Sequence, residues 1–344
     1  PTTFANSLTE LASHPRYKEL LNLPFKTFII TAETINKKNE ANYFLRIAFS
    51  EFTTDDLNAL YKDFYDLTIY LLSNYKNSGK TLIIQTPNEM DWSMIGTFDT
   101  TKTPSPLAIR NATAYWNQIQ NAINDAKIAM PEDGVKIYHG CELNLVQKAM
   151  NGAKTVTNDV LPNTHCDLYG YSAYDTVLMN VSNSADTSTL TNALEYIASK
   201  APDSTAFGNK NVYISEIGIA ERPYPTVDTG MILTRYISQA LSWGAPLVNT
   251  WALYDNECTT YLPTTNESCP GYWVKKPDGS LSSTYQNIKS NFTITITPTI
   301  APNRQALSCD PNKDGEVNQQ DFQYWKDEFI GEKTTKITDC FHPD

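Results

Sequence analysis

The sequence predicts an α/β protein: a (β/α)8 barrel of which strands three to eight are present, followed by a small helical module. Short, almost continuously apolar segments alternate with longer segments of helical periodicity, the pattern that parallel βαβ units require. Acidic and aromatic residues follow the ends of the apolar segments, where parallel barrels place their reactive groups. A Thr/Pro-rich stretch then precedes a polar C-terminal segment.

The apolar segments are expected to form six strands, each buried on both faces. They span residues 26–33, 81–85, 135–140, 167–171, 211–215 and 247–251. The periodic segments predict helices over 8–21, 53–77, 109–130, 190–200 and 231–243. His14-Pro15 disturbs the first of these helices, and Thr53 caps the second.

A closed barrel of this kind has eight strands, and each missing βα unit needs roughly 30 residues. Only residues 1–25 precede the first predicted strand. We therefore expect a barrel that is truncated at its N-terminus. The alternative is an open doubly wound sheet, which predicts a Gly-rich phosphate turn after an early strand, and the sequence has no such turn.

Composition and length narrow the possible partners and the domain plan. The 344 residues carry a formal net charge of −11, which disfavours nucleic acid because phosphates repel an acidic surface. No apolar run is long enough for a membrane span, and the first residues do not resemble a signal peptide. The expected domains are a barrel over 1–292, a Thr/Pro linker over 293–308 and a module over 309–344.

The six cysteines indicate an oxidising, extracellular compartment. Cys258 and Cys269 lie in one polar loop, and Cys309 and Cys340 bracket the C-terminal module, so both pairs are expected as loop-closing disulfides. Cys141 and Cys166 fall on predicted strands. The sequence there is compatible both with two buried free thiols and with a third disulfide. We therefore expect a secreted protein.

The strand ends carry the candidate site residues. In chain order they are Glu33, Asn88, Glu89, Asp91, Trp92, Glu142, Asn144, Tyr171, Tyr174, Asp175, Glu216, Trp251 and Asp255. Carboxylates bind hydroxyl groups and aromatic rings stack on apolar C–H faces, so this mixture favours a carbohydrate ligand. The motifs of serine hydrolases, zinc proteases and P-loop proteins are absent from the sequence.

Two segments, Ile-Gln-Thr-Pro-Asn-Glu-Met-Asp-Trp over 84–92 and Val-Tyr-Ile-Ser-Glu-Ile-Gly over 212–218, resemble the active-site strands of clan A retaining glycoside hydrolases. In that clan an Asn-Glu pair ends the fourth barrel strand and a lone Glu ends the seventh. The predicted strands agree with this spacing, because two of them lie between Glu89 and Glu216. Met90 stands where the clan more often has proline.

The resemblance implies Glu89 as general acid/base and Glu216 as nucleophile, with no cofactor for catalysis. It also implies that Asn88 binds the sugar 2-hydroxyl and that Tyr171 or Tyr174 orients the nucleophile. Trp251 would form the floor of the subsite that binds the sugar ring. Further substrate contacts are expected from Trp92 and Glu142. For both tryptophans core packing is the alternative, and Glu142, like Glu33, could instead hold the catalytic groups.

The C-terminal module carries an EF-hand-type calcium loop over residues 310–321. Oxygen ligands occupy the coordinating positions, and Gly315 stands where the loop turns sharply. The expected Ca2+ ligands are Asp310, Asn312, Asp314, Glu316, Asn318 and Asp321. The loop and the helix after it resemble one dockerin repeat, which implies a cohesin-type scaffold protein as partner.

Two functions follow from these patterns. The first is a retaining glycoside hydrolase that cleaves β-linked polysaccharides or oligosaccharides by double displacement. The alternative is a non-catalytic glycan-binding barrel attached to a scaffold through its dockerin-like module. A retaining enzyme needs its two carboxyl groups about 5 Å apart in an open cleft, so geometry separates the two readings.

Overall fold

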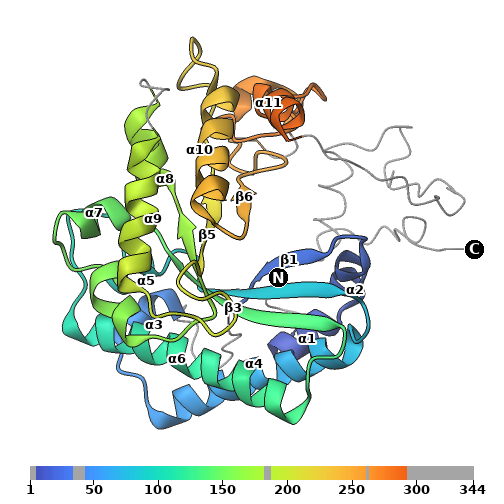
Figure 1. The fold of residues 1–344 in the computed structure, drawn as a ribbon, viewed down its shortest axis with the longest axis vertical. Helices are drawn as coiled ribbons and strands as arrows, with labels where there is room; N and C mark the ends of the chain where they lie inside the picture. The colour runs from blue at the N-terminus through green and yellow to red at the C-terminus, as the bar shows by residue number, and fades with distance from the viewer. Residues whose placement is uncertain (1–4, 34–42, 182–186, 261–262, 293–344) are drawn as a thin grey trace, which may run out of the picture.

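The computed structural model describes residues 5–33, 43–181, 187–260 and 263–292 (Figure 1). In this part of the chain six parallel strands form one sheet, and their order in the sheet is their order in the sequence. They are β1 (Thr27–Thr31), β2 (Lys80–Thr86), β3 (Val135–Leu143), β4 (Leu168–Ser172), β5 (Val212–Ile217) and β6 (Val248–Thr250). The predicted parallel α/β sheet is confirmed, and its strand order is that of a partial barrel.

Helices follow the strands and cover one face of the curled sheet (Figure 1). Two short helices, α1 (Leu8–Ser13) and α2 (Pro15–Asn22), precede β1. The others are α3 (Tyr43–Phe49), α4 (Thr54–Asn74), α5 (Met90–Ile95), α6 (Pro106–Ala129), α7 (Val146–Met150), α8 (Tyr174–Val177), α9 (Ser188–Lys200), α10 (Thr229–Trp243) and α11 (Ser283–Asn291). Within the described residues β1 pairs only with β2, and β6 only with β5, so the sheet has two open edges.

The start of α4 shows how local sequence sets these elements. The Thr53 hydroxyl accepts a hydrogen bond from the Asp56 N–H, and Asp56 in turn accepts one from the Thr53 N–H, which together form a capping box. The buried side chains of α4 include Leu60, Phe64 and Leu71, which recur at helical spacing. The predicted helix and its cap are confirmed.

The single helix predicted over residues 8–21 is wrong, because the chain forms α1 and α2 there. His14 between them is extended, with φ −61° and ψ 138°. Proline lacks an N–H and disfavours the helical conformation of the residue before it. Pro15 therefore ends the first helix and begins the second.

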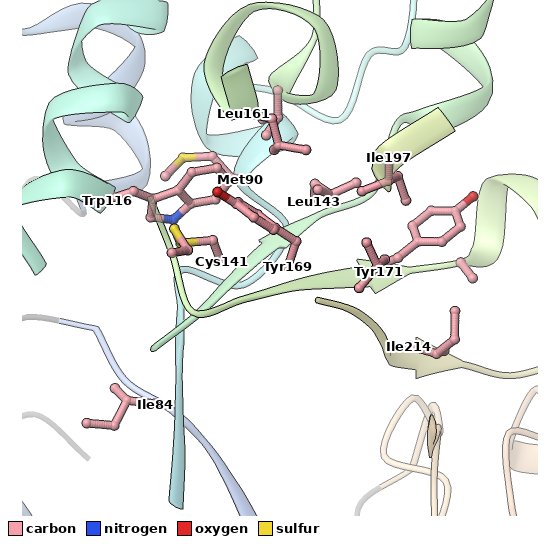
Figure 2. Close-up of a cluster of buried hydrophobic side chains, with 14 of the residues drawn as sticks. Ile84, Met90, Trp116, Cys141, Leu143, Leu161, Tyr169, Tyr171, Ile197 and Ile214 are labelled. Atoms are coloured by element: carbon pink, nitrogen blue, oxygen red, sulfur yellow. A yellow bond between two sulfur atoms is a disulfide. The ribbon is translucent and has the colours of Figure 1, made fainter. Parts of the chain in front are cut away.

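Side chains on the two faces of the sheet form two separate apolar cores. The larger core lies between strands and helices and includes Ile84, Cys141, Tyr169 and Ile214, part of which is shown in Figure 2. The smaller core, on the concave face, is built on Ile83, Leu168 and Tyr213. Alternate residues of a strand point to opposite faces, so β2, β4 and β5 each contribute to both cores.

Two disulfides are present in the described residues. Cys258–Cys269 closes the loop after β6, as predicted. Cys141–Cys166 joins β3 to the segment before β4, which decides the pairing that the sequence left open. Cys309, Cys340, the linker over 293–308 and the module over 309–344 lie outside the described residues. In the part of the chain that the structure describes, every helix is too short or too polar to cross a bilayer.

Candidate active site

The strand register brings the predicted site residues to one edge of the sheet. Thr86 pairs with Cys141, Leu143 with Tyr171, and Ser172 with Glu216. The segments that follow β2, β3, β4 and β5 therefore meet at the carboxyl ends of the strands. This edge carries Asn88, Glu89, Glu142, Tyr174 and Glu216.

A β-bulge in β5 aims Glu216 at the concave face. Ile214 and Ile217 both belong to the larger core although three positions separate them, whereas regular alternation would require two. The pairing shows the same extra residue, because Ile214 faces Tyr171 and Glu216 faces the next residue, Ser172. Bulges are common beside active sites, where they redirect a side chain.

Glu216 is partly buried and is held by two donors. The Tyr174 hydroxyl donates to Glu216 Oε2 over 3.3 Å. The Asn88 amide, oriented with its nitrogen toward the carboxyls, donates to Glu216 Oε1 over 3.2 Å. Burial raises the pKa of Glu216 to about 7, and the charge of Glu89 adds to this effect while the Tyr174 hydrogen bond opposes it.

Glu89 stands immediately before α5 in the left-handed conformation, with φ 48° and ψ 67°. Such backbone strain costs about 1–3 kcal/mol in a residue other than glycine and is typical of functional sites. The Ser172 hydroxyl donates to Glu89 Oε1 over 2.6 Å, and Trp92 Nε1 donates to Oε2 over 2.8 Å. Burial raises the pKa of Glu89, and these two hydrogen bonds oppose the shift.

Glu142 is the most buried of the three carboxyls, with 0% of its surface exposed. Its Oε2 accepts the backbone N–H of Glu89 over 2.9 Å and the Asn88 amide over 3.2 Å. Burial raises the pKa of Glu142 to about 8, and the charge of Glu216 raises it further. Because its carboxyl is buried and contacts Asn88 and Glu89, Glu142 fits the second of the two roles that the sequence left open, that of holding neighbouring site residues.

Tyr171, one of the two tyrosines expected to orient Glu216, points away from the site. Its ring is fully buried in the larger core (Figure 2), and its hydroxyl donates to Asp175 and lies 2.5 Å from Thr176 Oγ1. Alternation along β4 explains the difference, since Tyr171 points to the helices and Ser172 to the concave face. Tyr174 makes the contact to Glu216.

Two partly exposed tryptophans border the carboxyls. Trp92 donates to Glu89 and packs edge-on against Phe98, with ring centroids 5.7 Å apart and Phe98 73% exposed. Trp251 directly follows β6. Its hydrogen bond to Glu257 lowers the pKa of that carboxyl, against the larger effect of burial, which raises it. Both tryptophans are accessible from solvent, as stacking on a sugar ring requires.

Asp91 and Asp255, two further strand-end candidates, organise loops. Asp91 is buried and accepts the backbone N–H groups of Asn144, Leu145 and Val156 over 2.9–3.2 Å. Asp255 accepts those of Gly271, Tyr272 and Glu257 over 2.6–2.9 Å. Their lone pairs are committed to the backbone, so we assign them no contact with a ligand.

Sequence reasoning missed Ser172, Glu257 and Tyr272. Ser172 could have been found from alternation along its strand, because it shares a face with Gly170 and precedes Tyr174 by two residues. Glu257 and Tyr272 lie on loops, and the sequence carries no periodic signal for them. The Tyr272 ring packs edge-on against Tyr174 with centroids 6.2 Å apart.

The described residues contain two groups of possible metal ligands. They are His139 with Cys141 and Cys166, and Asp255 with Cys258 and Cys269. Each group includes both sulfurs of a disulfide, which are not thiolates and do not bind metal as thiolates do. The six predicted calcium ligands, Asp310 to Asp321, lie outside the described residues.

Comparison with solved structures extends the description of the fold. A crystal structure of GH5_18 from Streptomyces cattleya in complex with GlcNAc matches with a TM-score of 0.51 and 13% identity, over 80% of this chain and 63% of that one. The chain shares its fold with that protein. The E153A form of GH5_18 in complex with Manb1-4GlcNAc matches at a TM-score of 0.49, with 13% identity over 80% and 64% of the two chains.

A third structure, the exo-beta-1,4-mannosidase Op5Man5 from Opitutaceae bacterium strain TAV5, matches at a TM-score of 0.45, with 12% identity over 76% of this chain and 43% of that one. The chain thus spans less than two thirds of the length of these proteins. Neither protein-family models nor curated proteins match the sequence.

Proposed function

We propose that this chain belongs to a retaining glycoside hydrolase that cleaves β-linked glycans. One observation carries the proposal: Glu89 follows β2 and Glu216 lies near the end of β5, with two strands between β2 and β5, yet both carboxyls belong to one partly exposed site. Asn88 and Tyr174 both donate to Glu216, and Ser172 and Trp92 both donate to Glu89. Two carboxyls in different environments are what double displacement at an anomeric carbon needs.

In the first step the ionised Glu216 carboxylate attacks the anomeric carbon while the bond from that carbon to the leaving oxygen breaks. Glu89 gives its proton to the leaving oxygen. The glycosyl group is then held as an ester of Glu216, and Glu89, now ionised, takes a proton from the water that attacks the same carbon. Glu216 leaves as a carboxylate, so the product keeps the configuration of the substrate.

The groups around the site favour a neutral sugar. Glu89, Glu216 and Glu257 interact electrostatically, so an acidic sugar would be repelled from this end of the sheet. Trp92 and Trp251 offer ring faces for stacking, and Asn88 is exposed between the carboxyls. The fold shared with GH5_18 from Streptomyces cattleya is compatible with this proposal.

A screen of the protein on β-linked polysaccharides and aryl β-glycosides tests the proposal. We expect release of reducing ends with retained configuration, and complete loss of this activity in Glu216→Gln. Binding without hydrolysis, unchanged in Glu216→Gln, would instead support the non-catalytic glycan-binding barrel.

We further propose, from sequence alone, that the chain is secreted and that residues 309–344 bind structural calcium and dock on a cohesin-type scaffold. The spacing of the oxygen ligands over 310–321 supports calcium. The two disulfides in the described residues are compatible with an oxidising compartment. Pull-down on immobilised cohesin, with calcium and with chelator, tests the partner.

A further inference from the structure

We propose that Glu142 is a positioning residue that works as a neutral carboxylic acid, fixing Glu89 and Asn88 while Glu216 carries the charge. The inference rests on the proposed function for its catalytic consequence.

The two oxygens of Glu142 have different surroundings. Oε2 accepts two N–H groups, from the backbone of Glu89 and the side chain of Asn88. Oε1 is buried and receives no hydrogen bond within the described residues. An ionised carboxylate would leave buried charge on Oε1 with at most the Ser215 hydroxyl to stabilise it, whereas in a carboxylic acid Oε2 is the carbonyl oxygen and Oε1 carries the proton.

Ser215 supplies the acceptor that such a proton needs. The Ser215 hydroxyl hydrogen-bonds the Glu142 carboxyl, a contact that by itself lowers the pKa of Glu142, and Ser215 Oγ is likewise buried without another partner in the described residues. A proton on Glu142 Oε1 that is donated to Ser215 Oγ pairs both groups at once. The bulge in β5 places Ser215 here, next to the nucleophile.

The neighbouring charges favour the protonated form of Glu142, whereas its hydrogen bonds to Ser215 and to the Glu89 N–H lower its pKa. Glu216 and Glu89 both interact electrostatically with Glu142, and both raise its pKa. Of the three carboxyls Glu142 is the fully buried one, so burial penalises its ionised form most. Glu142 therefore keeps a proton of its own, in addition to the proton that Glu89 gives to the leaving oxygen.

This arrangement would serve catalysis through two contacts. The hydrogen bond from the Glu89 N–H to Glu142 Oε2 holds Glu89 in its left-handed conformation. The Asn88 amide spans Glu142 and Glu216. Ionisation of Glu142 would draw this amide away from Glu216 and add a negative charge beside the nucleophile.

Glu142→Gln tests the protonation of Glu142, because glutamine reproduces the shape and hydrogen bonds of the neutral acid. The folded wild type keeps this proton up to a pH of about 8, but an unfolded chain releases it near its ordinary pKa. Wild-type stability should therefore fall relative to Glu142→Gln as the pH rises from 5 to 9. We expect the urea midpoints of the two proteins to diverge over this range, and an infrared band of a protonated carboxyl at pH 7 that the variant lacks.

Glu132→Gln is the matched control. Glu132 precedes the same strand, β3, and accepts the Ile137 N–H over 2.7 Å, but it is ion-paired with Lys127 and Lys136 at 3.7 and 3.3 Å. The urea midpoint of Glu132→Gln should not exceed that of the wild type at any pH. Parallel midpoints for wild type and Glu142→Gln, or failure of Glu142→Gln to fold at pH 5, would overturn the inference.

Activity separates this inference from the proposed function. On a cleaved substrate, Glu142→Gln should hold its kcat to higher pH than wild type, and Glu142→Ala should lose at least tenfold in kcat at every pH. If the wild type cleaves no β-glycoside but its urea midpoint diverges from that of Glu142→Gln as stated, the proposed glycosidase activity is refuted and the protonation of Glu142 is not. An active enzyme in which Glu142→Gln and wild type share one pH profile refutes the role of Glu142 alone.

Discussion

Tyr213 on β5 and Gln85 on β2 are joined by a hydrogen bond of 2.7 Å between the Tyr213 hydroxyl and Gln85 Oε1, although β3 and β4 lie between their strands. The phenol ring crosses these strands at Gly140 and Gly170. A Cβ atom at Gly140 would lie 2.6 Å from the Tyr213 hydroxyl, and one at Gly170 would lie 2.8 Å from the ring. Because Gly140 and Gly170 have no side chains, the Tyr213 ring can lie across β3 and β4.

We expect Gly140→Ala to destabilise the protein by about 1–3 kcal/mol, because the new methyl group meets the Tyr213 hydroxyl in a closely packed core. Removing that hydroxyl in Tyr213→Phe should relieve part of the clash, so the double variant should be less destabilised than the sum of the single ones. Gly170→Ala should show no such relief, because a ring carbon remains 2.8 Å away. Urea unfolding of the variants measures these differences, and strict additivity for Gly140→Ala with Tyr213→Phe would contradict the contact.

The two carboxyls should respond differently to the leaving group. Glu216→Gln should lose turnover on every substrate, because no other group forms the glycosyl ester. Glu89→Gln should lose roughly 10²- to 10⁴-fold on natural glycans, and far less on aryl glycosides whose leaving group needs no proton. Steady-state kinetics on both substrate types measures the contrast, and equal losses in the two variants would refute the separate roles.

Azide should rescue the alanine variants with opposite stereochemistry. In Glu216→Ala azide takes the place of the missing carboxylate and attacks the anomeric carbon from the face opposite the leaving group. We therefore expect an α-glycosyl azide from a β-glycoside. In Glu89→Ala azide attacks the glycosyl ester after the intermediate has formed, so we expect a β-glycosyl azide. Proton NMR of the products distinguishes the anomers, and a reversed result would exchange the two assignments.

Activity should fall as the pH drops below about 7, because Glu216 attacks only as a carboxylate and its pKa lies near that value. Burial raises this pKa. In the proposed mechanism Glu89 is protonated when Glu216 attacks, so Glu89→Gln keeps a neutral group in that place. The acidic limb of kcat/KM on an aryl glycoside should therefore stay near that of the wild type, while the alkaline limb, which Glu89 sets, should disappear. Glu195→Gln, the same change on α9, is the control and should leave both limbs in place.

Calcium should bind the loop over 310–321 through oxygen atoms at about 2.3–2.6 Å. Asp314→Ala removes the ligand at the fifth loop position and should weaken binding at least about tenfold, since ligand charge sets the affinity of such loops. Calorimetry on the full chain measures this affinity, with Glu328→Ala, outside the loop, as control. Unchanged affinity in Asp314→Ala would remove the assignment.

Much of the architecture follows from the sequence. Apolar periodicity located all six strands and most long helices, because burial of strands and helix faces imposes regular spacing. Thr53 with Asp56 marks the start of α4 by a purely local hydrogen-bond pattern. The same periodicity places the Asn-Glu pair at 88–89 and Glu216 at strand ends, and their resemblance to the active-site strands of clan A glycoside hydrolases distinguishes these two carboxyls from the other strand-end residues.

Only the tertiary structure decided which way those side chains face. Alternation along β4 directs Tyr171 into the core and Ser172 toward the site. Glu216 faces the site because an extra residue in β5 reverses the direction of its side chain. The sequence likewise placed Glu142 at a strand end without revealing that its neighbours exclude water. Orientation and burial depend on partners distant in the chain, and local spacing carries no information about them.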